Sequence, residues 1–301
     1  MTDQADLLAQ FSNALATRAA AAKGAIVAIR LPHGRHITGM VWRSDIVIAS
    51  EQSLPQMDDF ELVAAGGSVV AARIAGRDPS TNIAVLRLAE QVAAPSIATG
   101  EAHTGAIALA IGADGTGGAS ARLGIVNLAG AEWHSSRGGL IDRRIVLDVS
   151  LARREEGGPV LDAAGAYLGM STFGPRGQVI AIPTATLERI VPLLLKGGRI
   201  ARGWLGVGLQ AVAVPDALRE TADQSSGLMV MSVVEGGPAA QAGIVAGDII
   251  LSVDGISAHR FRRIAGYFGS DSIGRKADLR LIRGGEVITV QTTIAERPVH
   301  E

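Results

Sequence analysis

Short apolar runs separated by glycine and polar residues dominate the chain between residues 25 and 172. Each run is six or seven residues long and is followed by turn-forming residues. Such runs predict β-strands, and a series of them without intervening helices indicates an all-β sandwich or barrel. The predicted strands are 25–31, 37–42, 45–50, 68–74, 83–89, 106–112, 144–150 and 166–172.

Three segments repeat their apolar residues at helical spacing, namely 1–22, 183–198 and 258–268. A glycine pair ends the second of these, as is common at helix C-termini. A further strand is predicted over 287–294. We therefore divide the chain into an N-terminal helical segment (1–22), a first β domain (23–198) and a second domain (202–297).

Composition narrows the function classes. The 301 residues include 28 Lys plus Arg and 29 Asp plus Glu, so no bulk charge attracts nucleic acid. With 48% hydrophobic but only 3% aromatic residues, the cores must be aliphatic. The absence of cysteine excludes thiol catalysis and Cys-ligated metals. No cofactor is expected.

The start of the chain is polar and lacks the basic and apolar regions of a signal peptide. The sequence has no run of about 18 uncharged apolar residues, so no membrane span is predicted. The chain as written is therefore expected in the cytoplasm, or in the periplasm if the native start lies upstream.

Five phrases, in this order, resemble the HtrA/DegP-like serine proteases: "GRDPSTNIAVLRLA", "LGIVNLAG", "LDVSLARREEGGPVLDAAGAYLGMST", "VIAIPTATLERIVPLLLKGGRIARGWLGV" and "GGPAAQAGIVAGDIILSVDG". The resemblance runs from about residue 20 to residue 297. It implies a mainly β fold, a trypsin-like double six-stranded β-barrel followed by a PDZ domain. It also implies a bacterial protein of protein quality control, and makes a homotrimer plausible, because related proteases commonly trimerise.

The positions that the family uses for catalysis hold other residues here. The histidine position falls on Glu51, or on Gln52 if the alignment shifts by one residue. The aspartate position holds Asn82 and the serine position holds Glu156. A serine hydroxyl needs a neighbouring base to lose its proton, and a carboxylate is a poor nucleophile toward an amide. This pattern predicts a pseudoprotease.

Several alternatives remain open at these positions. Ser50, Ser53 or Ser150 could serve as a relocated nucleophile in an active serine endopeptidase. Glu51 and Glu156 could form a carboxylate-based metal site for a hard cation, or an acidic rim paired with arginine. We also hypothesise that the Glu156 carboxylate folds onto the backbone N–H groups of its own turn and fills the oxyanion hole.

The second domain keeps the parts that PDZ domains use. These domains add an extended peptide as a strand and hold its terminal carboxylate on backbone N–H groups. The resemblance places the carboxylate loop at "GWLGVGL", and a helix beside it flanks the groove. We predict a scaffold or adaptor that binds protein C-termini with an apolar last residue, through Trp204, Leu205, Gly206, Val207, Leu209, Ile264 and Phe268.

Overall fold

A computed structural model describes residues 2–96, 98–259 and 261–298. Two compact units divide the chain. The first comprises Met1–Trp133 and Ile141–Arg199, and the second comprises His134–Leu140 and Ile200–Glu301. None of the helices within the described ranges is long and apolar enough to cross a membrane.

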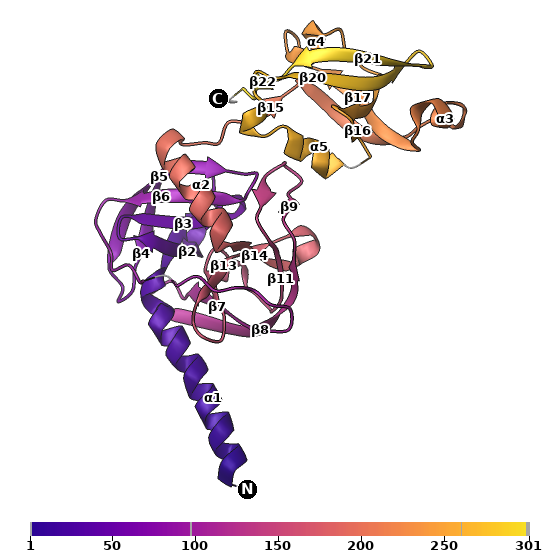
Figure 1. Ribbon diagram of the computed structural model, residues 1–301. Coiled ribbons are helices and arrows are strands. Elements are labelled where there is room, and N and C mark those ends of the chain that lie inside the picture. Colours follow the sequence, from indigo (N-terminus) through magenta and orange to yellow (C-terminus); the bar gives the residue numbers. More distant parts are fainter. Residues whose placement is uncertain (1, 97, 260, 299–301) are drawn as a thin grey trace. The chain divides into compact units, whose positions relative to one another are not determined.

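Two closed six-stranded barrels make up most of the first unit, as the sequence predicts (Figure 1). The first barrel has the strand order β1-β2-β3-β6-β5-β4 and the second the order β11-β14-β13-β12-β7-β8. The first barrel consists of β1 (Ile26–Leu31), β2 (Arg35–Arg43), β3 (Ile46–Ser50), β4 (Asp59–Val63), β5 (Val69–Asp78) and β6 (Ile83–Leu88). The second consists of β7 (Ile107–Ala113), β8 (Ala119–Gly130), β11 (Arg144–Asp148), β12 (Pro159–Leu161), β13 (Tyr167–Phe173) and β14 (Val179–Pro183).

All eight strands predicted in this region are present, with ends that shift by four residues at most. The pairings between them are antiparallel. Alternate or continuous apolar residues fill each barrel, as in β3, whose five residues are all buried. The cores are built from Val, Ile, Leu and Ala, as the low aromatic content requires.

Two helices accompany the barrels. α1 (Thr2–Ala21) leads into β1 and leaves Leu7, Leu8 and Phe11 exposed. α2 (Thr184–Gly197) contacts β5, β6, β13 and β14, so it lies against strands of both barrels. Its end agrees with the predicted glycine stop, because Gly198 adopts a left-handed conformation with φ 70° and donates its N–H to Leu194 O.

The second unit contains the PDZ domain. Its sheet has the order β16-β17-β18-β20-β21, so β16 is an edge strand. The strands are β15 (Gly203–Trp204), β16 (Val207–Ala213), β17 (Ser226–Val233), β18 (Ile249–Val253), β19 (Ile256–Ser257), β20 (Lys276–Arg283), β21 (Glu286–Thr293) and β22 (Ala295–Glu296). The helices are α3 (Arg219–Ala222), α4 (Pro238–Gln241) and α5 (Phe261–Tyr267). A two-stranded sheet pairs β9 (Trp133–His134) with β10 (Leu140–Ile141).

The predicted helix over 258–268 is shorter in the structure, where α5 covers Phe261–Tyr267. β19 occupies Ile256–Ser257 ahead of it, and residue 260 of the prediction lies outside the described residues.

Candidate functional site

The candidate site forms where two short turns meet between the barrels. One turn, Glu51–Ser53, follows β3, and the other, Arg153–Glu155, precedes Glu156. Backbone hydrogen bonds fix Glu156 in place, since Thr38 N donates to Glu156 O at 3.1 Å and Gly157 N donates to Ser171 O at 2.9 Å. The Glu156 side chain therefore starts from a rigid position between β2 and β13.

The Glu156 carboxylate is buried, with 1% of the residue exposed, and accepts hydrogen bonds from four side chains. Ser50 Oγ, Gln52 Nε2 and Thr172 Oγ1 donate to Oε1 at 2.7, 2.7 and 2.6 Å. Ser53 Oγ donates to Oε2 at 2.6 Å. Short bonds of this kind to an ionised acceptor are about twice as strong as neutral ones.

These hydrogen bonds decide the ionisation of Glu156. Burial disfavours the charged form and by itself raises the pKa. The hydrogen bonds from Ser53, Thr172, Gln52 and Ser50 outweigh burial and hold the pKa of Glu156 below its ordinary value of 4.5. The side chain is thus a buried carboxylate anion stabilised by neutral donors.

Asn82 supports this arrangement from the start of β6. It adopts φ 60°, a left-handed conformation that asparagine tolerates better than most residues. Its Oδ1 accepts from Gln52 N at 2.8 Å, and its Nδ2 donates to Ser50 Oγ at 3.0 Å and to Thr172 Oγ1 at 2.7 Å. The hydrogen bonds are therefore all oriented toward Glu156. The Asn82 amide donates to the hydroxyls of Ser50 and Thr172, and both hydroxyls donate to the Glu156 carboxylate.

The Glu51 side chain has Arg77 as an ion-pair partner. It is buried, and its Oε1 lies 3.8 Å from Arg77 Nη1. Gln52, the residue given by a one-residue shift of the alignment, turns its amide to Glu156 and also donates to Phe173 O at 2.9 Å. The two carboxylates expected to share a site thus have different partners. Within the described ranges, no group of three His, Cys, Asp or Glu side chains could hold a metal ion.

The hypothesis that Glu156 fills the oxyanion hole by binding the N–H groups of its own turn is wrong for this structure. Gly157 N donates to Ser171 O and Gly158 N donates to Glu155 O, at 2.9 and 3.4 Å. The carboxylate turns instead toward β3 and β13. The N–H groups of the turn bind carbonyl oxygens because the turn packs against neighbouring backbone, which the sequence motif alone does not reveal.

Glu155, a second buried carboxylate, was not singled out by the sequence. Arg122 Nε lies 3.0 Å from each of its carboxylate oxygens, and Ser120 Oγ and Ala152 N donate to it at 2.9 and 2.8 Å. Burial raises the pKa of Glu155, but the bonds from Ala152, Ser120 and Arg122 prevail and lower it. Glu155 thus connects the turn to β8.

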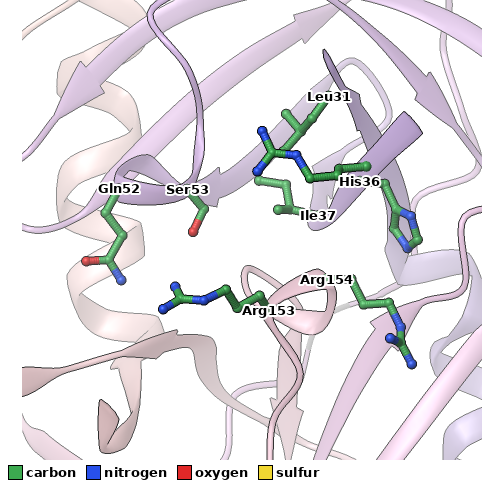
Figure 2. A pocket seen from close by; sticks show the side chains of 8 residues that line it. Leu31, His36, Ile37, Gln52, Ser53, Arg153 and Arg154 are labelled. Carbon is green, nitrogen blue, oxygen red and sulfur yellow. The ribbon is translucent and has the colours of Figure 1, made fainter. Parts of the chain in front are cut away.

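Two cavities, of about 440 and 530 Å³, lie beside the Gln52 and Ser53 side chains that bind Glu156, and Glu156 itself lines the larger one. They share Gln52, Ser53 and Arg153 as lining residues, and in Figure 2 the Arg153 side chain extends toward the other two. The first cavity is also lined by Leu31, Arg35, His36, Ile37 and Arg154. The second is also lined by Leu151, Glu156, Phe173, Gly174 and Gly177.

The predicted peptide loop of the PDZ domain has the backbone that its role requires. Gly206 adopts φ 78°, and a Cβ there would lie 3.1 Å from the Trp204 ring. Val207 and Leu209 lie on the edge strand β16, half-buried, and pair with β17 on the other side. One side of β16 is therefore available for an added strand.

The remaining predicted groove residues have different degrees of burial. Leu205 and Ile264 are 5% and 3% exposed and belong to the core of the domain. Phe268 is half-buried, packs edge-on against Tyr267 and accepts a bond from Gly203 N at 3.0 Å through its carbonyl. Which of these side chains contact a peptide stays a prediction.

Comparisons with known families agree with both units. A trypsin-like peptidase domain model matches residues 37–170, and a PDZ domain model matches residues 203–294. The chain is 30% identical, over 262 residues, to a probable periplasmic serine endoprotease DegP-like of Brucella suis, covering 84% of this chain and 50% of that one. The chain thus has a trypsin-like peptidase domain followed by a PDZ domain, and it is similar to the HtrA/DegP-like proteases.

The chain is also similar to a further curated relative and to solved structures. The serine endoprotease DegS of Escherichia coli is 28% identical over 264 residues, covering 84% of this chain and 74% of DegS. A solved serine endoprotease from Yersinia pestis superposes with a TM-score of 0.71 at 26% identity, covering 95% and 98% of the two chains. The HtrA-type protease AlgW with a decapeptide has a TM-score of 0.72 at 23% identity, covering 95% and 99%. This HtrA-like chain spans about half the length of the Brucella relatives.

Proposed function

We propose that this HtrA-like chain does not cleave peptides and instead acts as a peptide-binding scaffold or adaptor. The observation that carries the proposal is the buried Glu156 carboxylate, which stands in the serine position and accepts hydrogen bonds from four surrounding side chains. In this proposal Gln52, in preference to Glu51, occupies the position of the catalytic histidine, and Asn82 occupies the position of the catalytic aspartate.

The chemistry of these three side chains supports inactivity. Gln52 has an amide, which neither accepts nor releases a proton near neutral pH. Asn82 carries no charge to stabilise a protonated base. In well-studied triads, loss of the catalytic members leaves about 10³–10⁴-fold acceleration over water, far below the usual enzymatic range.

A fluorophosphonate probe tests the proposal directly. An activated serine Oγ attacks its phosphorus and expels fluoride, so labelling reports a working nucleophile. We expect no labelling of the purified chain and no hydrolysis of unfolded casein, with trypsin as the positive control. Stoichiometric labelling of one serine would refute inactivity.

A second candidate function rests on Ser53. Its hydroxyl lines both cavities and donates to Glu156 Oε2 at 2.6 Å, which is a nucleophile beside a carboxylate base. The lowered pKa of Glu156 weakens that base, because an effective general base has a pKa near the working pH. Labelling that disappears in Ser53→Ala would establish this alternative of an endopeptidase with relocated residues.

The proposed ligands are protein C-termini or extended peptides with an apolar last residue. The edge position of β16 and the left-handed Gly206 support strand addition and carboxylate capture by the PDZ domain. Trp204, Leu205, Val207, Leu209, Ile264 and Phe268 complete the proposed binding region.

Assembly and compartment form part of the proposal. The exposed Leu7, Leu8 and Phe11 on α1 support a homotrimer, which light scattering would detect as three times the 30.9 kDa chain mass. The Brucella relatives are named periplasmic, so we propose the periplasm instead of the cytoplasm. Fractionation by osmotic shock would locate the protein.

A further inference from the structure

An unusual distribution of charge surrounds the cavity of about 440 Å³. Arg35, His36, Arg153 and Arg154 all line it. Figure 2 shows His36, Arg153 and Arg154 around this cavity. The whole chain has a net charge of −1, so this concentration of positive charge is local. This group of arginines lies next to the hydrogen-bond network of Glu156.

Several arginines elsewhere in the same unit have acidic partners. Arg143 pairs with Glu101 at 2.8 Å, and Arg189 pairs with Asp142 at 2.7 Å. Arg122 pairs with Glu155, as described above. In a unit with this many ion pairs, arginines that lack an acidic partner are available to an external anion.

The three arginines at the cavity have no acidic partner within residues 2–96, 98–259 and 261–298. Arg35 Nε donates to Pro32 O at 3.4 Å, and the Arg153 guanidinium lies 5.6 Å from the centre of the Phe173 ring. Glu156 does not neutralise them, because hydroxyl and amide donors occupy its oxygens. A guanidinium offers paired donors whose geometry matches a carboxylate or a phosphate.

The shape of the site favours an extended ligand over a single small ion. The two cavities share Gln52, Ser53 and Arg153 as lining residues, so they are neighbours, and we call the two together the trough. Each lies in the range of about 300–1,000 Å³ that is typical of ligand sites. Apolar side chains line both parts, including Leu31 in the first and Phe173 in the second. A ligand that carries both acidic and apolar groups would match the arginines and the apolar side chains of the lining.

We propose that this trough binds an extended acidic peptide segment, whose Asp or Glu carboxylates pair with Arg35, Arg153 and Arg154. The ligand here is an internal segment and needs no free C-terminus. The inference therefore goes beyond the PDZ function and adds a second recognition site in the trypsin-like domain.

Fluorescence polarisation with the full chain tests this site. The probe is a labelled octapeptide of alternating Glu and Leu with an amidated C-terminus, which removes the carboxylate that a PDZ loop binds. We expect saturable binding that weakens as salt is raised, because ion pairs at an accessible site are screened. The same peptide with Gln in place of Glu should bind at least about tenfold more weakly, since it loses several such pairs.

Arginine variants locate the binding. Arg153→Gln and Arg154→Gln should each weaken binding about two- to fivefold, and the triple variant with Arg35→Gln about tenfold or more. Arg73→Gln is the matched control, because Arg73 is exposed, pairs with Asp59 at 3.6 Å and does not line either cavity. Thermal melting of each variant confirms that it is folded.

Three outcomes would overturn the proposal. They are unchanged affinity in the triple variant, an equal loss in Arg73→Gln, and full displacement of the peptide by inorganic phosphate at submillimolar concentration, which would indicate a site for single anions. Loss of amidated-peptide binding in Gly206→Val would place the peptide on the PDZ domain and also count against the trough. Fluorophosphonate labelling has no bearing on these results, so the two proposals fail separately.

Discussion

At the scale of single residues, the adjacent carboxylates of Glu155 and Glu156 are buried by two different means. Glu155 pairs with the guanidinium of Arg122, whereas Glu156 relies on hydroxyl and amide donors alone. A buried carboxylate without compensation would be strongly unfavourable. The hydroxyl and amide donors around Glu156 offset the cost of desolvating its carboxylate without a neutralising cation. The neighbouring arginines are therefore not needed to neutralise Glu156.

Replacing Glu156 with glutamine should lower the free energy of unfolding at pH 7 by about 2 kcal/mol, the contribution expected of hydrogen bonds to a charged group. The folded-state pKa of Glu156 lies below 4.5, so the unfolded chain takes up its proton first as pH falls. The stabilisation is therefore complete above about pH 4.5 and is lost as pH falls from there through the folded-state pKa. Urea denaturation of both proteins between pH 3 and pH 7 measures this difference.

The exposed Glu61, which pairs with Arg30 at 2.8 Å, provides the control. Glu61→Gln should change stability by less than about 1 kcal/mol at every pH. If the difference between wild type and Glu156→Gln were the same at pH 3 and pH 7, the Glu156 carboxylate would not be the titrating group.

At the scale of elements, Thr38 on β2 connects the site to both barrels. Its hydroxyl donates to Arg154 O at 2.8 Å and accepts from Ala113 N at 2.9 Å, and its own N–H donates to Glu156 O. The residue is fully buried. One hydroxyl thus links β2, β7 and the turn that carries Glu156.

Thr38→Val should destabilise the first unit by about 1–3 kcal/mol, because it leaves a buried N–H and a buried carbonyl without their partner. Thr38→Ser keeps the hydroxyl and should lose less, mainly the packing of one methyl group. Urea denaturation of both variants separates the two effects. A larger loss in Thr38→Ser than in Thr38→Val would instead assign the role of Thr38 to its methyl group.

Gly158 is required for its small size. A Cβ at this position would lie 1.8 Å from Ile111 O, a backbone atom that cannot move aside cheaply. Gly158→Ala should cost more than about 3 kcal/mol, among the larger single-residue effects. Gly197→Ala, at the end of α2 with no atom within 4 Å of the added Cβ, is the matched control and should be close to neutral in the same thermal or urea unfolding. Comparable unfolding midpoints for the two variants would contradict the packing argument.

At the scale of the whole molecule, each unit has its own hydrophobic core and its own proposed ligand. A change in the PDZ loop should therefore leave the barrels unaffected. Gly206→Val places a branched side chain at φ 78° against the Trp204 ring, which strains the loop that would hold a peptide carboxylate.

We expect Gly206→Val to weaken binding of C-terminal peptides by tenfold or more, corresponding to about 1.4 kcal/mol. Isothermal titration with a peptide ending in an apolar residue measures this, and its amidated form should not bind the PDZ domain of either protein. Circular dichroism during thermal unfolding checks that the barrels are unchanged. Unaltered affinity for the free-carboxylate peptide would show that the loop is not the carboxylate site.

Much of the molecule could be predicted from the sequence. The short apolar runs indicated the strands, because strand periodicity and turn residues act locally. The two barrels and the PDZ domain were implied by the resemblance to HtrA/DegP-like proteases. The site was less predictable. Whether Glu51 or Gln52 faces Glu156 depends on the turn after β3, which rotates side chains by amounts that residue counting cannot give. The roles of Thr172 and Arg122 depend on contacts between strands distant in the sequence.

The direction of the hydrogen bonds around Glu156 has a consequence for which residues this position can hold. Serine in place of Glu156 would leave Ser50, Ser53, Thr172 and Gln52 without the acceptor toward which they now point. Glu156→Ser alone would therefore give a less stable protein. A serine at this position becomes tolerable only if the residues that now donate to the carboxylate change with it, so these positions are coupled.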